Sequence, residues 1–220
     1  TPYSIYTNVH KLVPGTVLHI RDNDTLSDTL NVPIPYWSLK RIVKTGGGNR
    51  FSGSPVEATQ QLESHLLEAV GRQMLADVPL GAFLSGGIDS SMVVAMMQAH
   101  SRQRIKTFSI GFTESRYNEA EHAKAVAQHL GTEHTEFYVS PGQALEVIPD
   151  IPDYYDEPFS DSSQIPTYLL SKLARKHVTV SLTGDGGDEL FGGYNRYTWG
   201  KTILKYTGCF PASVIHLATN

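Results

Sequence analysis

From about residue 55 onward, short apolar runs alternate with segments of helical period, and this alternation most constrains the fold. It predicts an α/β fold with a doubly wound, mostly parallel sheet and helices on both faces. Ligands of such sheets bind beyond the carboxyl ends of the strands. Apolar, β-prone runs predict strands over 80–84, 105–111, 134–139 and 178–182. Helices are predicted over 54–75, 90–100, 117–130, 140–148, 162–177 and from about 188.

The composition divides the chain before this alternation begins. Residues 1–43 are rich in loops, with short β-prone pieces at 16–20 and 36–39. Residues 44–54, KTGGGNRFSGS, are rich in glycine and polar side chains, which predicts a linker or loop. The alternating segment, 55–220, follows as the main domain. Within it, 150–161 is an acidic, aromatic stretch expected to form a loop.

Charge and cysteine content exclude several classes of protein. The net charge is -4, whereas a nucleic-acid binder that neutralises phosphates needs a basic face, so we expect no nucleic-acid partner. No apolar run is long enough for a bilayer, so no membrane partner is expected either. The single cysteine, Cys209, excludes a disulfide within the chain and favours a reducing compartment, which points to the cytoplasm.

The segment 84–91, LSGGIDSS, has the properties of a phosphate-binding loop. It follows a predicted strand and opens a predicted helix, whose N-terminus attracts anions. Gly86 and Gly87 allow backbone N–H groups to approach an anion closely. The segment has no Gly-Lys-Ser/Thr, no three-glycine dinucleotide fingerprint and no Gly-x-Ser-x-Gly elbow. Three hydroxyl groups add donors: Ser85, Ser90 and Ser91.

An acid, Asp89, lies inside this loop. A carboxylate beside a polyphosphate repels it unless a cation lies between them. We therefore predict that Asp89 holds Mg²⁺ against the phosphates.

A second glycine-rich segment, 180–194, VSLTGDGGDELFGGY, also follows a predicted strand and is expected at the same edge of the sheet. It places Asp185, Asp188 and Glu189 within five residues, and a bound cation or an ammonium substrate would offset their repulsion. The spacing does not fit an EF-hand. A solvated acidic turn is the alternative for this segment taken alone.

The S-G-G-x-D-S-S loop after a strand resembles the pyrophosphate loop of the PP-loop ATP pyrophosphatase family. Together with TGDGGDELFGGY, it resembles the synthetase domain of asparagine synthases. The resemblance covers roughly 55–200. It extends to the first forty residues, which are similar to the end of the preceding amidotransferase domain. Further similar segments are 107–112, 117–119, 127–131 with His134, 156–159 and 161–163, and in the first forty residues 8–18 and 36–37.

The resemblance implies ATP-dependent amidation of aspartate through β-aspartyl-AMP, with ATP and Mg²⁺ and with ammonia derived from glutamine. Asp185 would accept a proton from ammonium. Leu84 and Ile110 would flank the adenosine, and the other positions divide among four roles. Residues 85–91 would hold the pyrophosphate and Thr183 and Gly184 would contact the nucleotide, while Asp89 and Asp188 would share Mg²⁺ and Glu189 and Tyr194 would place the aspartate.

The family pattern also implies what this chain lacks. Residues 1–43 are expected to be the C-terminal remnant of a glutamine amidotransferase domain with its connector, because they resemble the end of that domain. The family's glutaminase half begins with a nucleophilic cysteine, whereas this chain begins with Thr1 and has no cysteine before Cys209, so that half is expected to be absent. The family's later phosphate lysine would lie beyond Asn220, so 55–220 is expected to be a synthetase domain truncated at its C-terminus and incomplete as a catalyst. The full-length protein is also expected to be able to form a homodimer.

Two alternatives stay open. A related amidotransferase or a β-lactam-forming synthetase uses the same loops on another carboxylate. A nucleotide-binding module without turnover is an alternative of a different class.

Overall fold

The computed structural model describes residues 2–20, 32–112 and 120–207, and the chain divides into two compact units. One unit comprises 1–64 and 149–161, and the other comprises 65–148 and 162–220. The first three residues of the helix predicted over 117–130 lie outside the described residues, as does Cys209.

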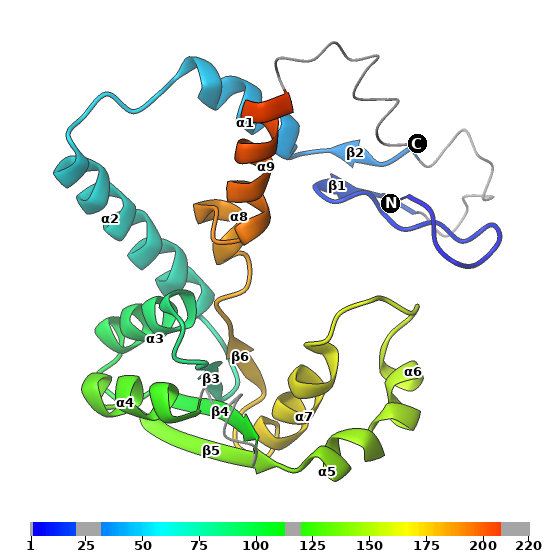
Figure 1. Ribbon diagram of the computed structural model, residues 1–220, viewed down its shortest axis with the longest axis vertical. Coiled ribbons are helices and arrows are strands. Elements are labelled where there is room, and N and C mark those ends of the chain that lie inside the picture. Colours follow the sequence, from blue (N-terminus) through cyan, green and yellow to red (C-terminus); the bar gives the residue numbers. More distant parts are fainter. Residues whose placement is uncertain (1, 21–31, 113–119, 208–220) are drawn as a thin grey trace. The chain divides into compact units, whose positions relative to one another are not determined.

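The second unit contains a four-stranded sheet in which all strands run parallel (Figure 1). The strand order is β5-β4-β3-β6, so the two strands that precede the glycine-rich loops, β3 and β6, are neighbours. Ala82 of β3 pairs with Thr107 of β4 on one side and with Leu182 of β6 on the other. The predicted parallel sheet is confirmed. Its strands are β3 (Leu80–Phe83), β4 (Lys106–Phe112), β5 (Glu133–Val139) and β6 (Val180–Leu182).

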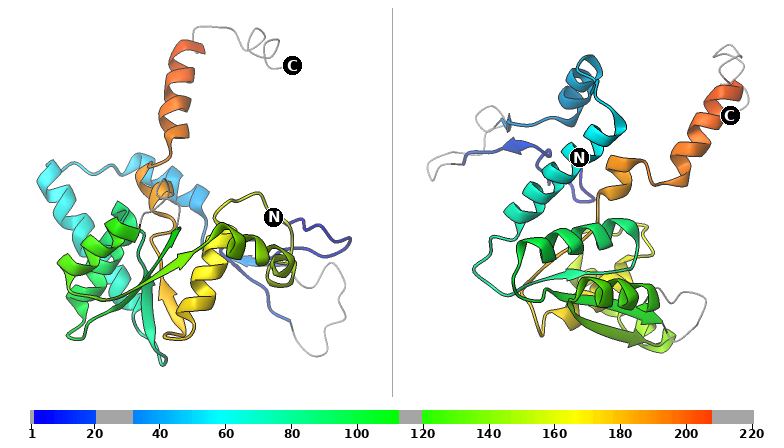
Figure 2. Two further views of the ribbon diagram at one scale, coloured as in Figure 1. Left: turned by 60° about the horizontal axis from the view of Figure 1, so that its bottom comes forward. Right: turned by 90° about the vertical axis from the view of Figure 1, so that its left-hand side faces the viewer.

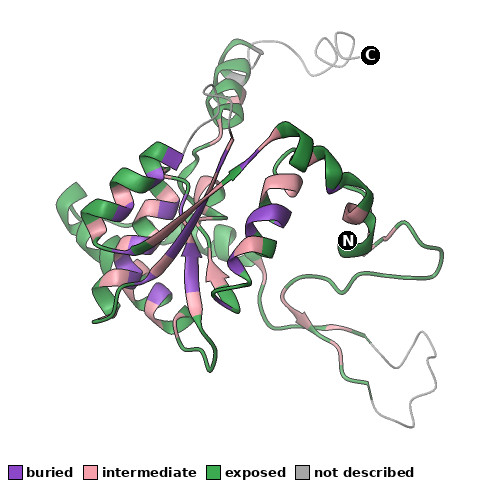
Figure 3. Cartoon of the chain, turned by 90° about the horizontal axis from the view of Figure 1, so that it is seen from below, coloured by how far each residue is buried: buried purple, intermediate pink, exposed green. Residues whose placement is uncertain are grey.

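Helices cover both faces of this sheet, and each face has its own hydrophobic core (Figures 2 and 3). On one face, Ala82 and Leu84 pack with the buried side chains of α3 (Ile88–His100) and α4 (Ala120–Leu130). The C-terminal part of α2 (Pro55–Gln73) joins this core. On the other face, Phe83 and Phe108 pack against α7 (Gln164–Ala174). Successive strand residues point to opposite faces, which explains this division.

The predicted helix boundaries have local causes. α2 begins after a capping box, in which the Ser54 N–H donates to Glu57 Oε2 at 2.7 Å and the Glu57 N–H donates to Ser54 Oγ at 3.3 Å. Ser140 and Gln143 form a second capping box at α5 (Pro141–Glu146), which a 3-10 turn over Ile148–Asp150 follows. Gly131, at φ +72°, lies immediately after α4 in the left-handed conformation that commonly ends helices.

Two helices follow β6. α8 (Gly187–Phe191) is bounded by two glycines in the left-handed conformation, Gly186 and Gly192. α9 (Asn195–Thr207) continues the chain.

The first unit contains less regular structure than the second. Its two short antiparallel strands, β1 (Thr16–Val17) and β2 (Ile34–Pro35), pair through Thr16 with Pro35. In the same unit Glu157 forms an ion pair with Lys11 and accepts a hydrogen bond from the Ile5 N–H at 3.3 Å.

Two predicted loops are partly helical. The prediction of a linker or loop over 44–54 is wrong for residues 44–48, because α1 (Leu39–Gly48) includes them. The Ser38 side chain caps α1 by accepting from the Arg41 N–H, which starts the helix despite its three terminal glycines. The acidic stretch 150–161 contains a one-turn helix, α6 (Ile151–Tyr154), with a proline in its first turn. None of the helices in the described ranges combines the length and apolarity that crossing a membrane requires.

Candidate functional site

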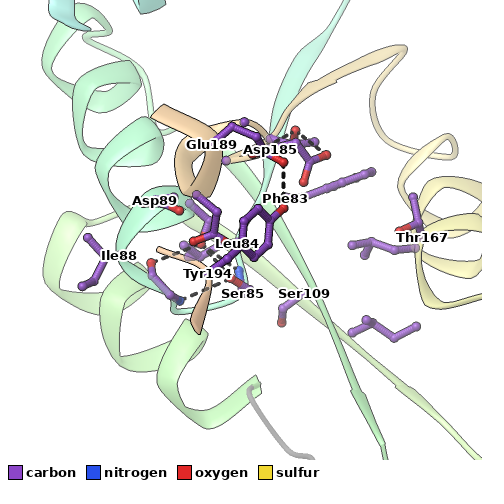
Figure 4. Close-up of a pocket in the computed structure, with 18 residues that line it drawn as sticks. Phe83, Leu84, Ser85, Ile88, Asp89, Ser109, Thr167, Asp185, Glu189 and Tyr194 are labelled. Atoms are coloured by element: carbon purple, nitrogen blue, oxygen red, sulfur yellow. Dashed lines mark hydrogen bonds between the residues drawn. The ribbon is translucent and has the colours of Figure 1, made fainter. Parts of the chain in front are cut away.

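A cavity of about 380 Å³ lies at the carboxyl ends of the strands, within the second unit (Figure 4). The loop after β3 and the loop after β6 form two of its walls. The end of β4 and one side of α7 complete it. This is the position at which parallel α/β sheets bind ligands, and the volume is within the range of small-molecule sites.

Hydrogen bonds hold the first glycine-rich loop in a compact turn. Ser85 Oγ and Ser90 Oγ lie 2.9 Å apart, and the Ser85 N–H donates to Ser90 Oγ at 3.2 Å. The Gly87 N–H donates to Ser85 Oγ at 3.3 Å. Gly87 is the N-cap of α3 and has no side chain to cap the first turn. The N-terminus of α3 therefore faces the cavity as an anion-attracting end of a helix.

The two glycines of this loop have different roles. Gly86 has φ +82°, and a Cβ there would lie 2.7 Å from the Ala123 backbone nitrogen in α4. Gly86 is thus required for the turn and for its packing on α4. At Gly87 the nearest atom to an added Cβ would be Ser85 Oγ at 3.3 Å, and Gly87 lines the cavity. A ligand in the cavity can therefore come close to the backbone of Gly87.

The second glycine-rich loop packs directly on the first. A Cβ on Gly184 would lie 2.6 Å from the Ser90 backbone nitrogen and 2.9 Å from the Asp89 carbonyl carbon. A Cβ on Gly187 would collide with the Asp89 carboxylate. Glycine at 184 is needed for the two loops to come this close, because its neighbours are backbone atoms that cannot rotate away. At 187 a side chain would force the Asp89 carboxylate to move.

Thr183 orients Asp185 at the rim of the cavity. Its hydroxyl donates to Asp185 Oδ2 at 2.9 Å, and the Asp185 N–H donates to Thr183 Oγ1 at 3.3 Å. One Asp185 oxygen is thereby fixed, while the side chain stays exposed.

Glu189 and Tyr194 form a hydrogen-bonded pair on the same side of the cavity. Tyr194 Oη donates to Glu189 Oε1 at 2.7 Å, and the guanidinium of Arg196 lies 4.1 Å from the centre of the tyrosine ring. The hydrogen bond from Tyr194, followed by that from the backbone N–H of Glu189 itself, lowers the pKa of Glu189. The same bond is the largest cause of the raised pKa of Tyr194. The pair therefore presents a carboxylate at neutral pH.

Asp89 and Asp188 both line the cavity and suit a magnesium ion held jointly with phosphate oxygens. Mg²⁺ usually takes one or two protein carboxylates and completes its shell with water and substrate phosphates. Among the residues described by the structure, no group of three or more histidine, cysteine or acidic side chains is arranged to hold a metal.

The structure gathers most of the residues predicted from the sequence around this one cavity. Gly86 and Ser91 do not line it, and Ser91 Oγ is buried without a hydrogen-bond partner among the described residues. The predicted residues that line it are Leu84, Ser85, Gly87, Asp89, Ser90, Ile110, Thr183, Gly184, Asp185, Asp188, Glu189 and Tyr194.

Five lining residues were not predicted from the sequence: Phe83, Ser109, Thr167, Leu170 and Gly186. A sixth, Ile88, lies within the predicted segment 85–91 but was given no role of its own. Phe83, Ile88, Ser109 and Gly186 adjoin predicted positions, so the spread of the two loops and of the end of β4 could have indicated them. Thr167 and Leu170 come from α7, and no local signal in the sequence marks them. The packing of α7 on the sheet alone brings them to the cavity.

Comparison with known proteins places this arrangement in a family. The family model described as asparagine synthase matches residues 61–214. A putative glutamine-hydrolyzing asparagine synthetase 2 of Methanocaldococcus jannaschii is 42% identical over 195 residues, which cover 88% of this chain and 36% of that one. The glutamine-hydrolyzing asparagine synthetase 1 of Bacillus subtilis is 42% identical over 138 residues, covering 63% of this chain and 22% of that one.

Among solved structures, a glutamine-dependent NAD⁺ synthetase from Acinetobacter baumannii matches with a TM-score of 0.47 and 20% identity, over 66% of this chain and 29% of that one. The fold is that of an α/β domain with a parallel sheet and a cavity at the carboxyl ends of its strands. The chain belongs to the asparagine synthase family. It spans about a third of the length of the first of these relatives.

Proposed function

We propose that this chain is the synthetase segment of a glutamine-dependent asparagine synthase, which amidates aspartate at the expense of ATP. The observation that carries the proposal is the contact between the two glycine-rich loops at the ends of β3 and β6. Together they surround one cavity with a helix N-terminus, serine hydroxyls and four acids. The match to the asparagine synthase family supports the choice of reaction.

In this proposal ATP binds along the first loop. Leu84 and Ile110, at the ends of β3 and β4, flank the adenosine. The hydroxyls of Ser85 and Ser90 and the N-terminus of α3 hold the pyrophosphate, since hydrogen-bond donors and a positive helix end suit that charge. Thr183 and Gly184 contact the nucleotide from the second loop, which the close packing at Gly184 supports.

Asp89 and Asp188 would hold Mg²⁺, which when bound neutralises phosphate charge and polarises the α-phosphorus. The protein's own contribution is to keep the two carboxylates at one cavity. The packing of Gly187 on Asp89 supports this, because no side chain at 187 displaces the carboxylate.

The first chemical step is the attack of the aspartate β-carboxylate on the α-phosphorus of ATP. A new carboxylate–phosphorus bond forms, the bond to the β-phosphate oxygen breaks, and pyrophosphate leaves. Glu189 and Tyr194 place the aspartate, and the ionised Glu189 suits its α-ammonium group.

The second step is amidation of the β-aspartyl-AMP. Ammonium loses one proton before its nitrogen attacks the acyl carbon. As the carbon–nitrogen bond forms, the bond between the acyl carbon and the phosphate oxygen breaks, and the nitrogen gives a second proton to the departing AMP. Asp185 accepts the first proton, with one oxygen anchored by Thr183 and the side chain exposed at the cavity rim. In the whole protein the ammonia comes from glutamine, supplied by a domain whose C-terminal remnant is 1–43. The segment 44–54 connects it to the synthetase domain, 55–220.

The test is aspartate-dependent exchange of labelled pyrophosphate into ATP with Mg²⁺, measured on this chain and on the full-length protein. We expect exchange with aspartate by the full-length protein, and a loss of roughly a hundredfold or more in its Asp89→Ala variant, because charge stabilisation by a metal contributes several kcal/mol. Asp77→Ala, an exposed carboxylate outside the cavity, is the matched control and should retain exchange. Exchange by the full-length protein with another carboxylate but not with aspartate would reject asparagine synthesis.

A further inference from the structure

The charged side chains that line the cavity all have the same sign. Among its lining residues, which all belong to the described part of the chain, four are acidic and none is lysine, arginine or histidine. Both ligands of the proposed function, ATP and aspartate, carry a net negative charge. Magnesium would offset phosphate charge, but the α-carboxylate of aspartate would find no cationic side chain in the wall. A cation at the edge of the cavity would supply that partner.

Arg196 packs against one of the lining residues, Tyr194. Its guanidinium carbon lies 4.1 Å from the centre of the Tyr194 ring, which is a cation–π contact. Arg196 is exposed, and it forms no ion pair with a carboxylate in the ranges that the structure describes. Its charge and its N–H donors are therefore available to a ligand.

Helix stability does not explain the position of this arginine. Arg196 is the second residue of α9, whose first turn contains no acidic side chain. A positive charge there lies at the positive end of the helix dipole, where it is unfavourable. The contact with Tyr194, two residues earlier, keeps the guanidinium beside a cavity-lining ring in spite of this cost.

Tyr194 brings a negative and a positive side chain together. Its hydroxyl donates to Glu189 Oε1 at 2.7 Å, as a dashed line marks in Figure 4, and its ring contacts Arg196. Glu189 and Arg196 thus share one tyrosine, yet no ion pair joins them in the described part of the chain. Two opposite charges that are held by one side chain without pairing suit a ligand that carries both charges.

An α-amino acid is such a ligand, because its ammonium and carboxylate groups are attached to one carbon. The ionised Glu189 suits the ammonium, and a guanidinium binds a carboxylate through two parallel N–H groups. We propose that Arg196 is a specificity-determining residue that binds the α-carboxylate of the acceptor amino acid. The site then takes an α-amino dicarboxylate and disfavours acids that lack the α-carboxylate. The inference rests on the proposed function, in which Glu189 receives the α-ammonium group and the β-carboxylate reacts.

The experiment measures pyrophosphate exchange by the full-length protein while the concentrations of aspartate and MgATP are varied separately. Arg196→Gln should raise the KM for aspartate about tenfold or more, because a hydrogen bond between charged groups is lost, and should leave the KM for MgATP unchanged. Arg196→Lys keeps the charge without the planar fork and should show a smaller increase. Arg102→Gln, which replaces an exposed arginine outside the cavity, is the matched control and should behave as the wild type does.

Two results would overturn the inference. One is an unchanged KM for aspartate in Arg196→Gln. The other is an increase in the KM for MgATP as large as that for aspartate, which would identify a phosphate group as the partner of Arg196.

β-Alanine provides a second readout, because it keeps the ammonium and the reacting carboxylate of aspartate and lacks only the α-carboxylate. Arg196→Gln should lower kcat/KM for aspartate but not for β-alanine, so the preference for aspartate should fall about tenfold. A preference as large as that of the wild type would show that Arg196 does not bind the α-carboxylate. Exchange by the wild-type protein with another carboxylate but not with aspartate would refute the proposed function itself, a result distinct from an unchanged KM for aspartate in Arg196→Gln.

Discussion

Replacing Gly184 by alanine tests the contact between the two glycine-rich loops. The new methyl group would lie 2.6 Å from the Ser90 nitrogen, 2.9 Å from the Asp89 carbonyl carbon and 3.0 Å from the Ser90 Cα. Ordinary contacts begin near 3.4 Å, and all three atoms belong to the backbone, so the loops must separate. Overpacking of this kind costs about 1–3 kcal/mol. We expect the free energy of unfolding to fall by that amount.

Separation of the loops should also weaken MgATP binding. If bringing the loops together again costs about 1.4 kcal/mol of binding free energy, the affinity falls about tenfold. Urea denaturation measures the first effect and calorimetric titration the second. Gly142→Ala in α5 is the control, because the nearest atom to its new methyl group is 3.9 Å away. Unchanged stability together with unchanged MgATP affinity in Gly184→Ala would refute the close packing of the two loops.

Three further predictions concern ionisable groups. In the full-length protein with ammonium as the nitrogen source, Asp185→Asn should keep pyrophosphate exchange. It should lower asparagine formation by about a hundredfold or more, because the substitution removes a general base. Equal losses in both assays would contradict this role. Tyr194→Phe should raise the pKa of Glu189 toward its ordinary value, measured by carboxyl NMR, because the hydrogen bond that lowers that pKa is gone. The free energy of unfolding should fall as pH drops from about 6.5 to the pKa of folded His134, which burial lowers, because the unfolded chain takes up the proton first. His134→Gln should lack this component, and identical pH profiles of the two proteins in denaturant titrations would rule it out.

Local signals in the sequence predicted much of the fold because their causes are local. The capping boxes at Ser54 and Ser140 fixed two helix starts, and Gly131 marked the end of α4. The prediction failed in part at 44–54, where a cap at Ser38 starts a helix that runs into the glycines. It also missed α6, a single turn too short to show a hydrophobic period.

The sequence by itself determined which residues form the two glycine-rich loops, since each follows an apolar strand and opens a helix. Only the tertiary structure decided that β3 and β6 are neighbours, which brings Gly184 onto Ser90 although they are far apart in the chain. It also decided that α7 lines the cavity and that the His134 ring contacts the Ser109 hydroxyl. Strand order, helix packing and buried hydrogen-bond partners depend on how whole surfaces fit together, and no local pattern of residues encodes them.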